Sequence, residues 1–185
     1  AGGAPFAVVL GLYNRALFSQ PFPLLDAVEM MRQVASALEY AHHQGVLHRD
    51  LKPDNIILRS EPMPSLPYRP VITDLGLAKL AGGDVETQVG TTMGTPAYMS
   101  PEQSLGQTAT AASDIYSLGI VLFELCTGQL PFQVRTLMEA VKAHTQAPPP
   151  APRTIRADIP ASLESVILKM LEKDPTRRYA DAALL

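Results

Sequence analysis

The segment from His48 to Asn55 holds the residues whose types and spacing could carry out chemistry. It reads His-Arg-Asp-Leu-Lys-Pro-Asp-Asn, a pattern that neither a helix nor a strand explains, and its proline predicts a loop. The side chains of Asp50, Lys52 and Asn55 can therefore converge on one point. A carboxylate to orient a hydroxyl, a cation to face a moving phosphoryl group and an amide oxygen for magnesium suit phosphoryl transfer.

The helices that must position this loop are predicted from hydrophobic periodicity. Apolar residues, Val28 among them, recur every three or four positions from Pro23 to Gly45, which predicts a long helix capped by that glycine. Three later helices are predicted. The first covers 113–126, with Ser113 or Asp114 as its N-cap and Gly128 just beyond its end. A capping box of Thr136 and Glu139 predicts the start of the second, and the third covers 162–171.

Short strands are predicted to follow the loop. Residues 56–58 predict one strand, and residues 71–72 predict another that ends at Asp74. Four prolines between positions 59 and 70 predict a connection that can at most reach the edge of a sheet. The two strands around this connection would bring Asn55 and Asp74 close together.

Composition limits the class of protein. The 185 residues, 46% hydrophobic and 18% charged, are enough for one globular domain or a large part of one. A net charge of -3 gives no electrostatic reason to expect nucleic acid as a partner. No apolar run reaches the ~18 residues that a membrane span needs, so no membrane segment is predicted within the chain.

Four residues with reactive side chains outside the loop are expected to have no chemical role. Cys126 lies in an apolar helical pattern and excludes an internal disulfide, because it is the single cysteine. His42 and His43 end the long helix and are expected to solvate its C-terminus. His144 shows no pattern that suggests a partner.

Two later motifs supply groups that a phosphoryl-transfer loop needs. Asp74-Leu75-Gly76 adds a carboxylate for magnesium and a glycine that lets the chain turn sharply. Residues 94–102, Gly-Thr-Pro-Ala-Tyr-Met-Ser-Pro-Glu, look like a loop that docks a protein substrate. With these motifs in this order, residues 5–185 resemble the eukaryotic-like serine/threonine protein kinases found in bacteria.

The resemblance implies an α+β, mainly α-helical chain with the protein-kinase-like fold. Residues 1–185 would be a partial kinase domain, with a strand-like hinge at about 5–13 and the large C-terminal lobe, which carries short β-strands, at about 14–185. The N-terminal lobe would be largely missing, because no Gly-x-Gly-x-x-Gly loop, strand lysine or partner glutamate appears. Since both ends look severed, the chain is expected to be a fragment with little or no kinase activity of its own.

The resemblance also implies roles in the reaction. Asp50 would be the catalytic base or hydroxyl-orienting group, and Lys52 would stabilise charge on the transferred phosphoryl group. Thr95 would hydrogen-bond toward both of them. The implied cofactors are ATP and Mg²⁺ (or Mn²⁺), with Asn55 and Asp74 holding the metal. A further cofactor-binding residue, lying under the adenine, would be Ile57.

Five residues would support the site without touching the reacting groups. His48 would pack between the loop and the Asp-Leu-Gly segment, and Asp114 would anchor the backbone of the loop from a buried helix. Glu102 would form an ion pair with Arg178 that fixes geometry more than it stabilises the fold. Leu75 replaces the phenylalanine that the family usually has, and its apolar side chain would still fill that place.

Regulation by phosphorylation is predicted from Arg49, which precedes Asp50. A phosphorylated Thr87, Thr91 or Thr92 could pair bidentately with its guanidinium and order the loop that carries it. Self-association for autophosphorylation is a further prediction. The chain is expected in the cytoplasm, either free or as the cytoplasmic domain of a membrane-anchored receptor kinase.

The predicted partners are ATP and a protein that presents serine or threonine, because Lys52 followed by Pro53 is typical of serine/threonine kinases. Two alternatives stay open. A pseudokinase-like binding or regulatory module usually lacks one of Asp50, Asn55 and Asp74, and all three are present here. A small-molecule, aminoglycoside-type phosphotransferase shares the Asp50 and Asn55 pattern, but Lys52 and the 94–102 loop favour a protein substrate.

Overall fold

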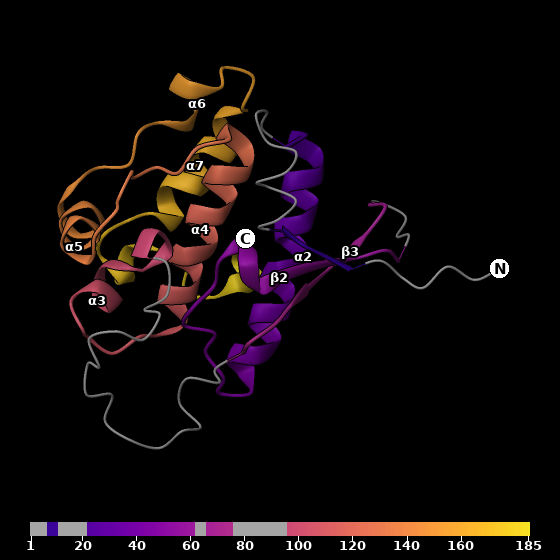
Figure 1. Ribbon diagram of the computed structural model, residues 1–185, viewed down its shortest axis with the longest axis horizontal. Helices are drawn as coiled ribbons and strands as arrows, with labels where there is room; N and C mark the ends of the chain where they lie inside the picture. The colour runs from indigo at the N-terminus through magenta and orange to yellow at the C-terminus, as the bar shows by residue number, and fades with distance from the viewer. Residues whose placement is uncertain (1–6, 11–21, 62–65, 76–95) are drawn as a thin grey trace.

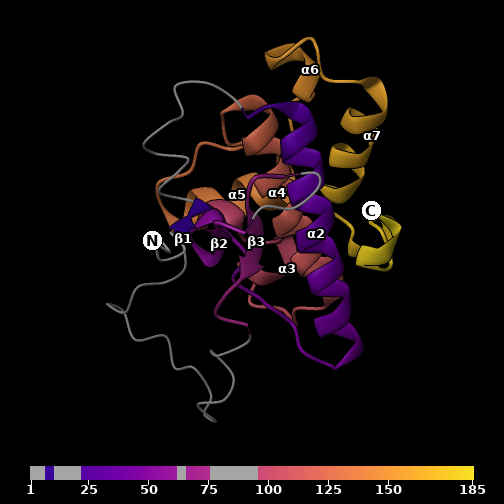
Figure 2. The ribbon, with the colours of Figure 1, turned by 90° about the vertical axis from the view of Figure 1, so that its right-hand side faces the viewer.

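Two long helices and a small sheet form the frame of the molecule, in a computed structural model that describes residues 7–10, 22–61, 66–75 and 96–185. Helix α2 (Leu24–His43) packs against α4 (Ala111–Thr127) and also against the sheet (Figure 1). Helix α7 (Ala161–Met170) packs against α4 in turn (Figure 2). The prediction of a mainly helical chain with a few short strands is confirmed.

The sheet has three antiparallel strands in the order β1, β2, β3 within the described part of the chain. These strands are β1 (Ala7–Val9), β2 (Ile56–Arg59) and β3 (Arg69–Ile72). Side chains alternate along β2, so Ile56 and Leu58 are buried in the core while Ile57 between them is half-buried on the opposite face. Pro70 lies in β3, which is the edge strand described here, as its missing N–H requires.

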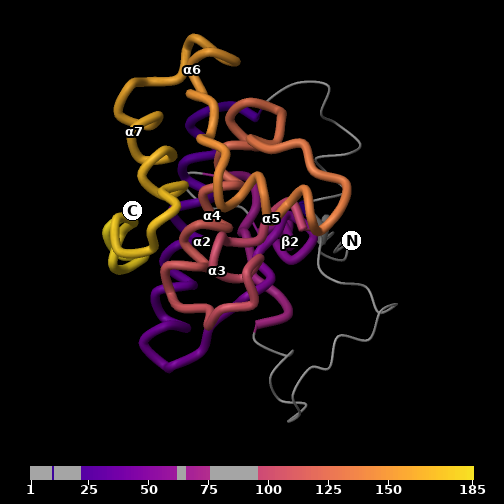
Figure 3. Tube along the Cα trace, turned by 90° about the vertical axis from the view of Figure 1, so that its left-hand side faces the viewer, coloured from indigo at the N-terminus to yellow at the C-terminus, as the bar shows by residue number. Residues whose placement is uncertain are grey.

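The remaining elements are short, and all of them except η1, which directly precedes β2, follow the sheet in sequence. They are η1 (Pro53–Asn55), η3 (Pro96–Tyr98), α3 (Pro101–Ser104), α5 (Leu137–Gln146), α6 (Pro152–Ile155), η4 (Pro175–Arg177) and η5 (Ala182–Leu184). α3 and α5 lie together beside α4, while η5 returns to contact α2 (Figure 3).

Helix α4 is the centre of the core. Every residue from Ser113 to Phe123 is buried, because α2, α7 and the short elements surround this helix. Gly119 allows a close approach to α7, since a Cβ at this position would lie 2.8 Å from the Cβ of Met170. Cys126 is buried in the same helix, which confirms the prediction of a core residue, and burial raises the pKa of its thiol to about 12.

The predicted start of α4 is wrong. Neither Ser113 nor Asp114 is the N-cap; Thr110 is, and its backbone N–H donates to the Ser113 Oγ at 3.0 Å. Ser113 is therefore the third residue of the helix, from which its hydroxyl reaches back to the cap. The predicted end is confirmed, because Gly128 has a φ of 74° and its N–H donates to the Glu124 carbonyl at 2.7 Å.

Two details of the other helices also differ from the predictions. At the start of α5, Thr136 Oγ1 accepts the Glu139 N–H as expected, but the Glu139 carboxylate accepts from the Arg135 N–H and not from that of Thr136. Val28, predicted on the apolar face of α2, is 41% exposed. In the part of the chain that the structure describes, no helix combines the length and apolar character needed to cross a membrane.

Candidate active site

The loop from His48 to Asn55 brings the side chains of Lys52 and Asn55 to Asp50. Lys52 Nζ donates to Asp50 Oδ2 at 2.7 Å, and Asn55 Nδ2 donates to the same oxygen at 3.3 Å and to the Asp50 carbonyl at 2.8 Å. The Lys52 side chain is 16% exposed, whereas that of Asp50 is 50% exposed. Two donors thus bind the Asp50 carboxylate, and half of this side chain remains exposed.

Asp74 lies beside Asn55 because β2 and β3 pair. The Thr73 N–H donates to the Asn55 carbonyl at 2.9 Å, one position beyond the last pair of the ladder, and Asp74 follows at once. Asp74 is exposed and has a φ of 60°, in the left-handed region that costs a non-glycine residue about 1 kcal/mol or more. The expected closeness of these two residues is therefore present.

The donor set at Asn55 and Asp74 fits a hard divalent cation. Since Asn55 uses its NH₂ group on Asp50, its amide oxygen is left for another partner. Among the described residues, neither this oxygen nor the Asp74 carboxylate has a hydrogen-bond partner. A carboxylate oxygen and an amide oxygen are ligands that Mg²⁺ accepts.

Asp114 fixes the start of the loop from the buried helix α4. Its two carboxylate oxygens accept the N–H groups of His48 and Arg49, each at 2.8 Å, and the residue is 1% exposed. Arg49 has a φ of 67°, so its backbone occupies the left-handed region that non-glycine residues disfavour. The buried carboxylate therefore stabilises a backbone conformation that the sequence alone would avoid.

His42, expected to solvate the C-terminus of α2, is instead buried and contacts the same carboxylate. Its Nε2 lies 2.8 Å from Asp114 Oδ2, and its side chain is 8% exposed. The prediction is wrong because His42 follows buried Leu38 by four positions and therefore continues the buried face of α2. That spacing was the available signal. His43 lies at the surface, with its Nε2 3.4 Å from Asp181 Oδ2.

His48 connects the loop to the segment that carries Asp74. Its Nδ1 accepts the Asp50 N–H at 3.3 Å, so Nε2 carries the proton and donates to the Thr73 carbonyl at 3.0 Å. The ring is 2% exposed. His48 thus contacts both the loop and the segment that carries Asp74, and its role in supporting the site stays a prediction.

Glu102 and Arg178 form a buried bidentate ion pair. Arg178 Nη1 and Nη2 donate to the two Glu102 oxygens at 2.8 and 2.9 Å, and Ser113 Oγ donates to one of them at 2.6 Å. Burial alone would raise the pKa of Glu102, but the hydrogen bonds from Arg178 and Ser113 lower it to about 2. The other Arg178 donors reach backbone carbonyls, including that of Ala112, so this buried charge is well satisfied.

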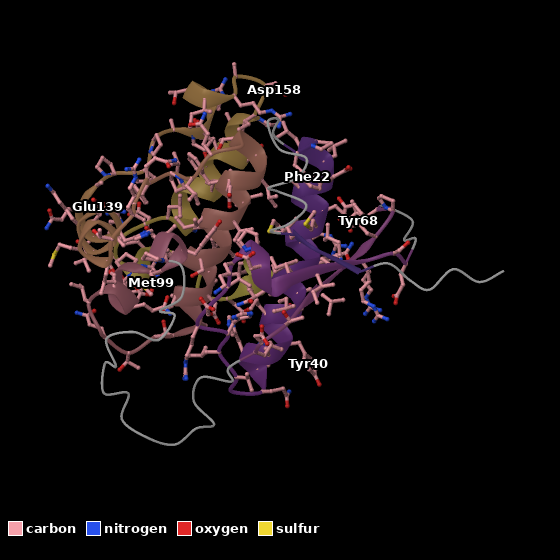
Figure 4. All side chains as sticks on the ribbon, in the orientation of Figure 1. Phe22, Tyr40, Tyr68, Met99, Glu139 and Asp158 are labelled. Carbon is pink, nitrogen blue, oxygen red and sulfur yellow. The ribbon has the colours of Figure 1, made fainter. Side chains whose placement is uncertain are left out.

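Leu75 does not fill a buried place among the described residues. It is 39% exposed and lines an open groove between α2 and β3, together with Val46 and with Tyr40, which is labelled in Figure 4. That Leu75 fills an apolar place stays a prediction, because residues 76–95, which follow it directly, lie outside the described residues. Gly76 lies outside the described residues.

The phosphorylation prediction is only partly visible. Thr87, Thr91, Thr92 and Thr95 lie outside the described residues. The guanidinium of Arg49 has no acidic partner within ion-pair distance among the described residues, so none of them neutralises it.

Two functional-site neighbours, Gln103 and His144, were missed by the sequence reasoning. Gln103 Nε2 donates to the Arg49 carbonyl at 2.6 Å, a contact between residues 54 positions apart that no local pattern announces. His144 is fully buried, with Nδ1 2.9 Å from the Tyr116 hydroxyl and Nε2 3.1 Å from the Pro96 carbonyl. Burial, reinforced by the nearby positive charge of Lys173, lowers the pKa of His144 to about 4, so its ring is neutral at physiological pH.

The fold and this site together are those of a known class. Residues 10–185 match the protein kinase domain family, and the chain belongs to that family. The kinase domain of Mycobacterium tuberculosis PknI superposes with a TM-score of 0.71 at 24% identity, over 96% of this chain and 59% of that one, a likeness that concerns the fold.

Curated relatives are bacterial serine/threonine kinases. The chain is 41% identical over 182 residues to the serine/threonine-protein kinase Pkn1 of Myxococcus xanthus, covering 98% of this chain and 25% of the relative. It is 39% identical over 157 residues to PrkC of Bacillus subtilis, covering 85% of this chain and 23% of the relative. The chain thus spans about a quarter of the length of these relatives.

Proposed function

We propose that this chain is the larger, C-terminal lobe of a serine/threonine protein kinase that uses ATP and magnesium, residues 1–185 forming part of its catalytic domain. The observation that carries the proposal is the convergence of Lys52 and Asn55 on the half-exposed Asp50 carboxylate, with Asp74 beside them. In the reaction, the substrate hydroxyl oxygen bonds to the γ-phosphorus of ATP while the bond from that phosphorus to the bridging oxygen of ADP breaks.

Each residue of the site has a part in that transfer. Asp50 orients the attacking hydroxyl and receives its proton, while the Lys52 ammonium, 2.7 Å from Asp50, offsets negative charge on the phosphoryl group. Asn55 and Asp74 would hold magnesium, which, when bound, neutralises charge on the phosphates of ATP. Ile57 presents an apolar face beside them, suited to the adenine ring.

A protein substrate is favoured by the rigid segment that follows Pro96. The Tyr98 hydroxyl donates to Glu124 at 2.7 Å, and the Tyr98 carbonyl accepts from Ser117 Oγ at 2.8 Å, both from α4. His144 holds the Pro96 carbonyl from α5. A segment fixed by two helices beside the catalytic loop provides a surface on which an extended peptide can dock.

The proposal extends to regulation and location. The Arg49 guanidinium, without an acidic partner among the described residues, suits a phosphothreonine at position 87, 91 or 92. Mass spectrometry of the active enzyme should find phosphate between Leu77 and Gly94, placed there by a second copy if the kinase self-associates. Because ATP is the donor, the lobe would act in the cytoplasm, free or as part of a membrane-anchored kinase.

The decisive experiment replaces Asp50 by asparagine in the protein expressed from its full coding sequence. Phosphate transfer from ATP to serine and threonine of protein substrates should fall by about 10²- to 10⁴-fold, while the melting temperature stays close to that of the unmodified protein. Asp26→Asn, at the other end of α2, has the same charge change and should leave transfer intact.

The same assay separates the competing functions. Phosphate transfer to aminoglycosides and not to proteins would indicate a small-molecule phosphotransferase. Transfer to neither, from a protein that still binds partners, would indicate a pseudokinase-like module. Full activity of Asp50→Asn on proteins would falsify the role given to Asp50.

A further inference from the structure

The peptide group between Arg49 and Asp50 is held at both of its polar ends. Its carbonyl accepts from Gln103 Nε2 at 2.6 Å, and its N–H donates to His48 Nδ1 at 3.3 Å. Because a peptide group is planar, two partners on opposite ends fix the orientation of the whole plane. That orientation sets the direction in which the Asp50 side chain leaves the backbone.

The Arg49 backbone needs such support. Its φ of 67° lies in the left-handed region, which costs a residue with a Cβ about 1 kcal/mol or more. Asp114 holds the N–H on one side of Arg49, and Gln103 holds the carbonyl on the other. Of these two supports, Asp114 is an expected anchor, whereas Gln103 reaches the loop from α3.

The orientation of the Gln103 amide is fixed by its partners. Its Oε1 accepts from the Ser100 N–H at 3.1 Å and from the Ser100 Oγ at 3.1 Å. A backbone N–H can only donate and a carbonyl can only accept, so the NH₂ group must face Arg49. The Gln103 amide thus joins two segments: its oxygen binds Ser100, the N-cap of α3, and its NH₂ group binds the catalytic loop.

We propose that Gln103 is a positioning residue for phosphoryl transfer, which holds the Arg49–Asp50 peptide so that the Asp50 carboxylate faces the substrate hydroxyl. This inference rests on the proposed function of Asp50. Through Gln103, the segment proposed to dock the substrate also has a direct hydrogen bond to Arg49, the residue before the proposed catalytic base.

Two reciprocal substitutions test the proposal in the full-length protein. Gln103→Glu keeps the acceptor for Ser100 but loses the donor to the Arg49 carbonyl. Gln103→Lys keeps a donor within reach of that carbonyl but loses the acceptor for Ser100. Gln107→Glu, four positions on and exposed, controls for the added charge.

Gln103→Glu should lower kcat by about tenfold to a hundredfold, because small misplacements of a catalytic group have large effects on rate. KM for ATP should stay within about twofold, since the lost contact does not involve the nucleotide. Gln103→Lys should retain more kcat than Gln103→Glu, even though it disturbs the cap. Lowering the pH should narrow the gap between Gln103→Glu and the unmodified enzyme, because a protonated carboxyl can donate to Arg49.

Amide hydrogen exchange supplies a readout that does not depend on activity. In Gln103→Glu the Asp50 amide should exchange faster, while the amides of α3 stay protected. If the unmodified protein phosphorylates no protein, the proposed function fails, yet the exchange of Asp50 still shows whether Gln103 holds the peptide. Unchanged exchange, or faster exchange with an unchanged kcat, overturns the positioning role, as does a lower kcat for Gln103→Lys than for Gln103→Glu.

Discussion

Glu102 and Asp114 are two buried carboxylates near the start of α4 that are neutralised in different ways. Glu102 receives a guanidinium and a hydroxyl, so its partners are side chains of the scaffold. Asp114 receives two backbone N–H groups from the catalytic loop and the ring of His42. An ion pair between side chains joins elements of the fold, whereas a carboxylate bound to backbone amides dictates the shape of a loop. The first should matter most for stability and the second for rate.

The largest effect on stability is expected from Arg178→Met. Removing the guanidinium leaves the Glu102 carboxylate buried without its charge partner, so the free energy of unfolding should fall by about 3–5 kcal/mol. Urea denaturation measures this change. The matched control is Arg32→Met, which breaks an exposed Arg32–Glu29 pair and should change stability little.

A double variant sharpens the same test. Adding Glu102→Gln to Arg178→Met removes the uncompensated charge, so the double variant should be more stable than Arg178→Met alone. Equal losses in Arg178→Met and Arg32→Met would mean that the buried pair has no special role in the scaffold.

Asp114→Asn should separate rate from stability. The replacement puts an NH₂ group where one of the two backbone N–H groups of His48 and Arg49 needs an acceptor. The loss of stability should be about 1–3 kcal/mol, smaller than for Arg178→Met. The kcat of Asp114→Asn should fall about a hundredfold, more than the kcat of Arg178→Met, because the backbone that carries Asp50 shifts. Normal kcat in a folded Asp114→Asn enzyme would contradict the distinction drawn between the two carboxylates.

A further effect concerns pH and extends the comparison to His144. Its pKa is about 4 in the folded protein against 6.5 for an ordinary histidine, so the unfolded chain binds the extra proton first. The contribution of neutral His144 to the free energy of unfolding is therefore fully present above pH 6.5 and is lost as the pH falls toward about 4. Glu102 has a pKa of about 2 in the folded protein against 4.5 for an ordinary glutamate, so its contribution to stability is lost at lower pH, between pH 4.5 and about 2.

His144→Phe isolates the upper pH window, from pH 6.5 to about 4, in which His144 titrates. In that variant the free energy of unfolding, measured by urea denaturation across a pH series, should fall less steeply between pH 6.5 and 4 than in the unmodified protein. The fall below pH 4.5 should persist, because Glu102 is unchanged. Identical slopes in both proteins through the upper window would show that His144 does not titrate as its burial requires.

Local patterns predicted most of the helices and strands well. The period of α2, the glycine that ends α4 and the strands on either side of the proline-rich connection all depend on neighbours in sequence, and the structure contains them. The closeness of Asn55 and Asp74 also followed, because pairing β2 with β3 leaves little freedom in where the two ends lie.

Contacts between distant segments could not be predicted in the same way. Gln103 and His144 act through hydrogen bonds to carbonyls 54 and 48 positions away, and a carbonyl is identical at every residue. Residue type therefore carries no information about which one is chosen. The start of α4 was misplaced for a related reason, because threonine and serine three positions apart can exchange the roles of cap and third residue.

The left-handed backbones of Arg49 and Asp74 have a consequence for protein engineering. A search for thermostabilising substitutions would favour glycine at both positions, since glycine adopts these φ values without strain. Either replacement would widen the range of shapes open to the loops and would discard the guanidinium or the carboxylate as well. Attempts to make this protein more heat-resistant should therefore leave the two residues unchanged and alter the scaffold instead.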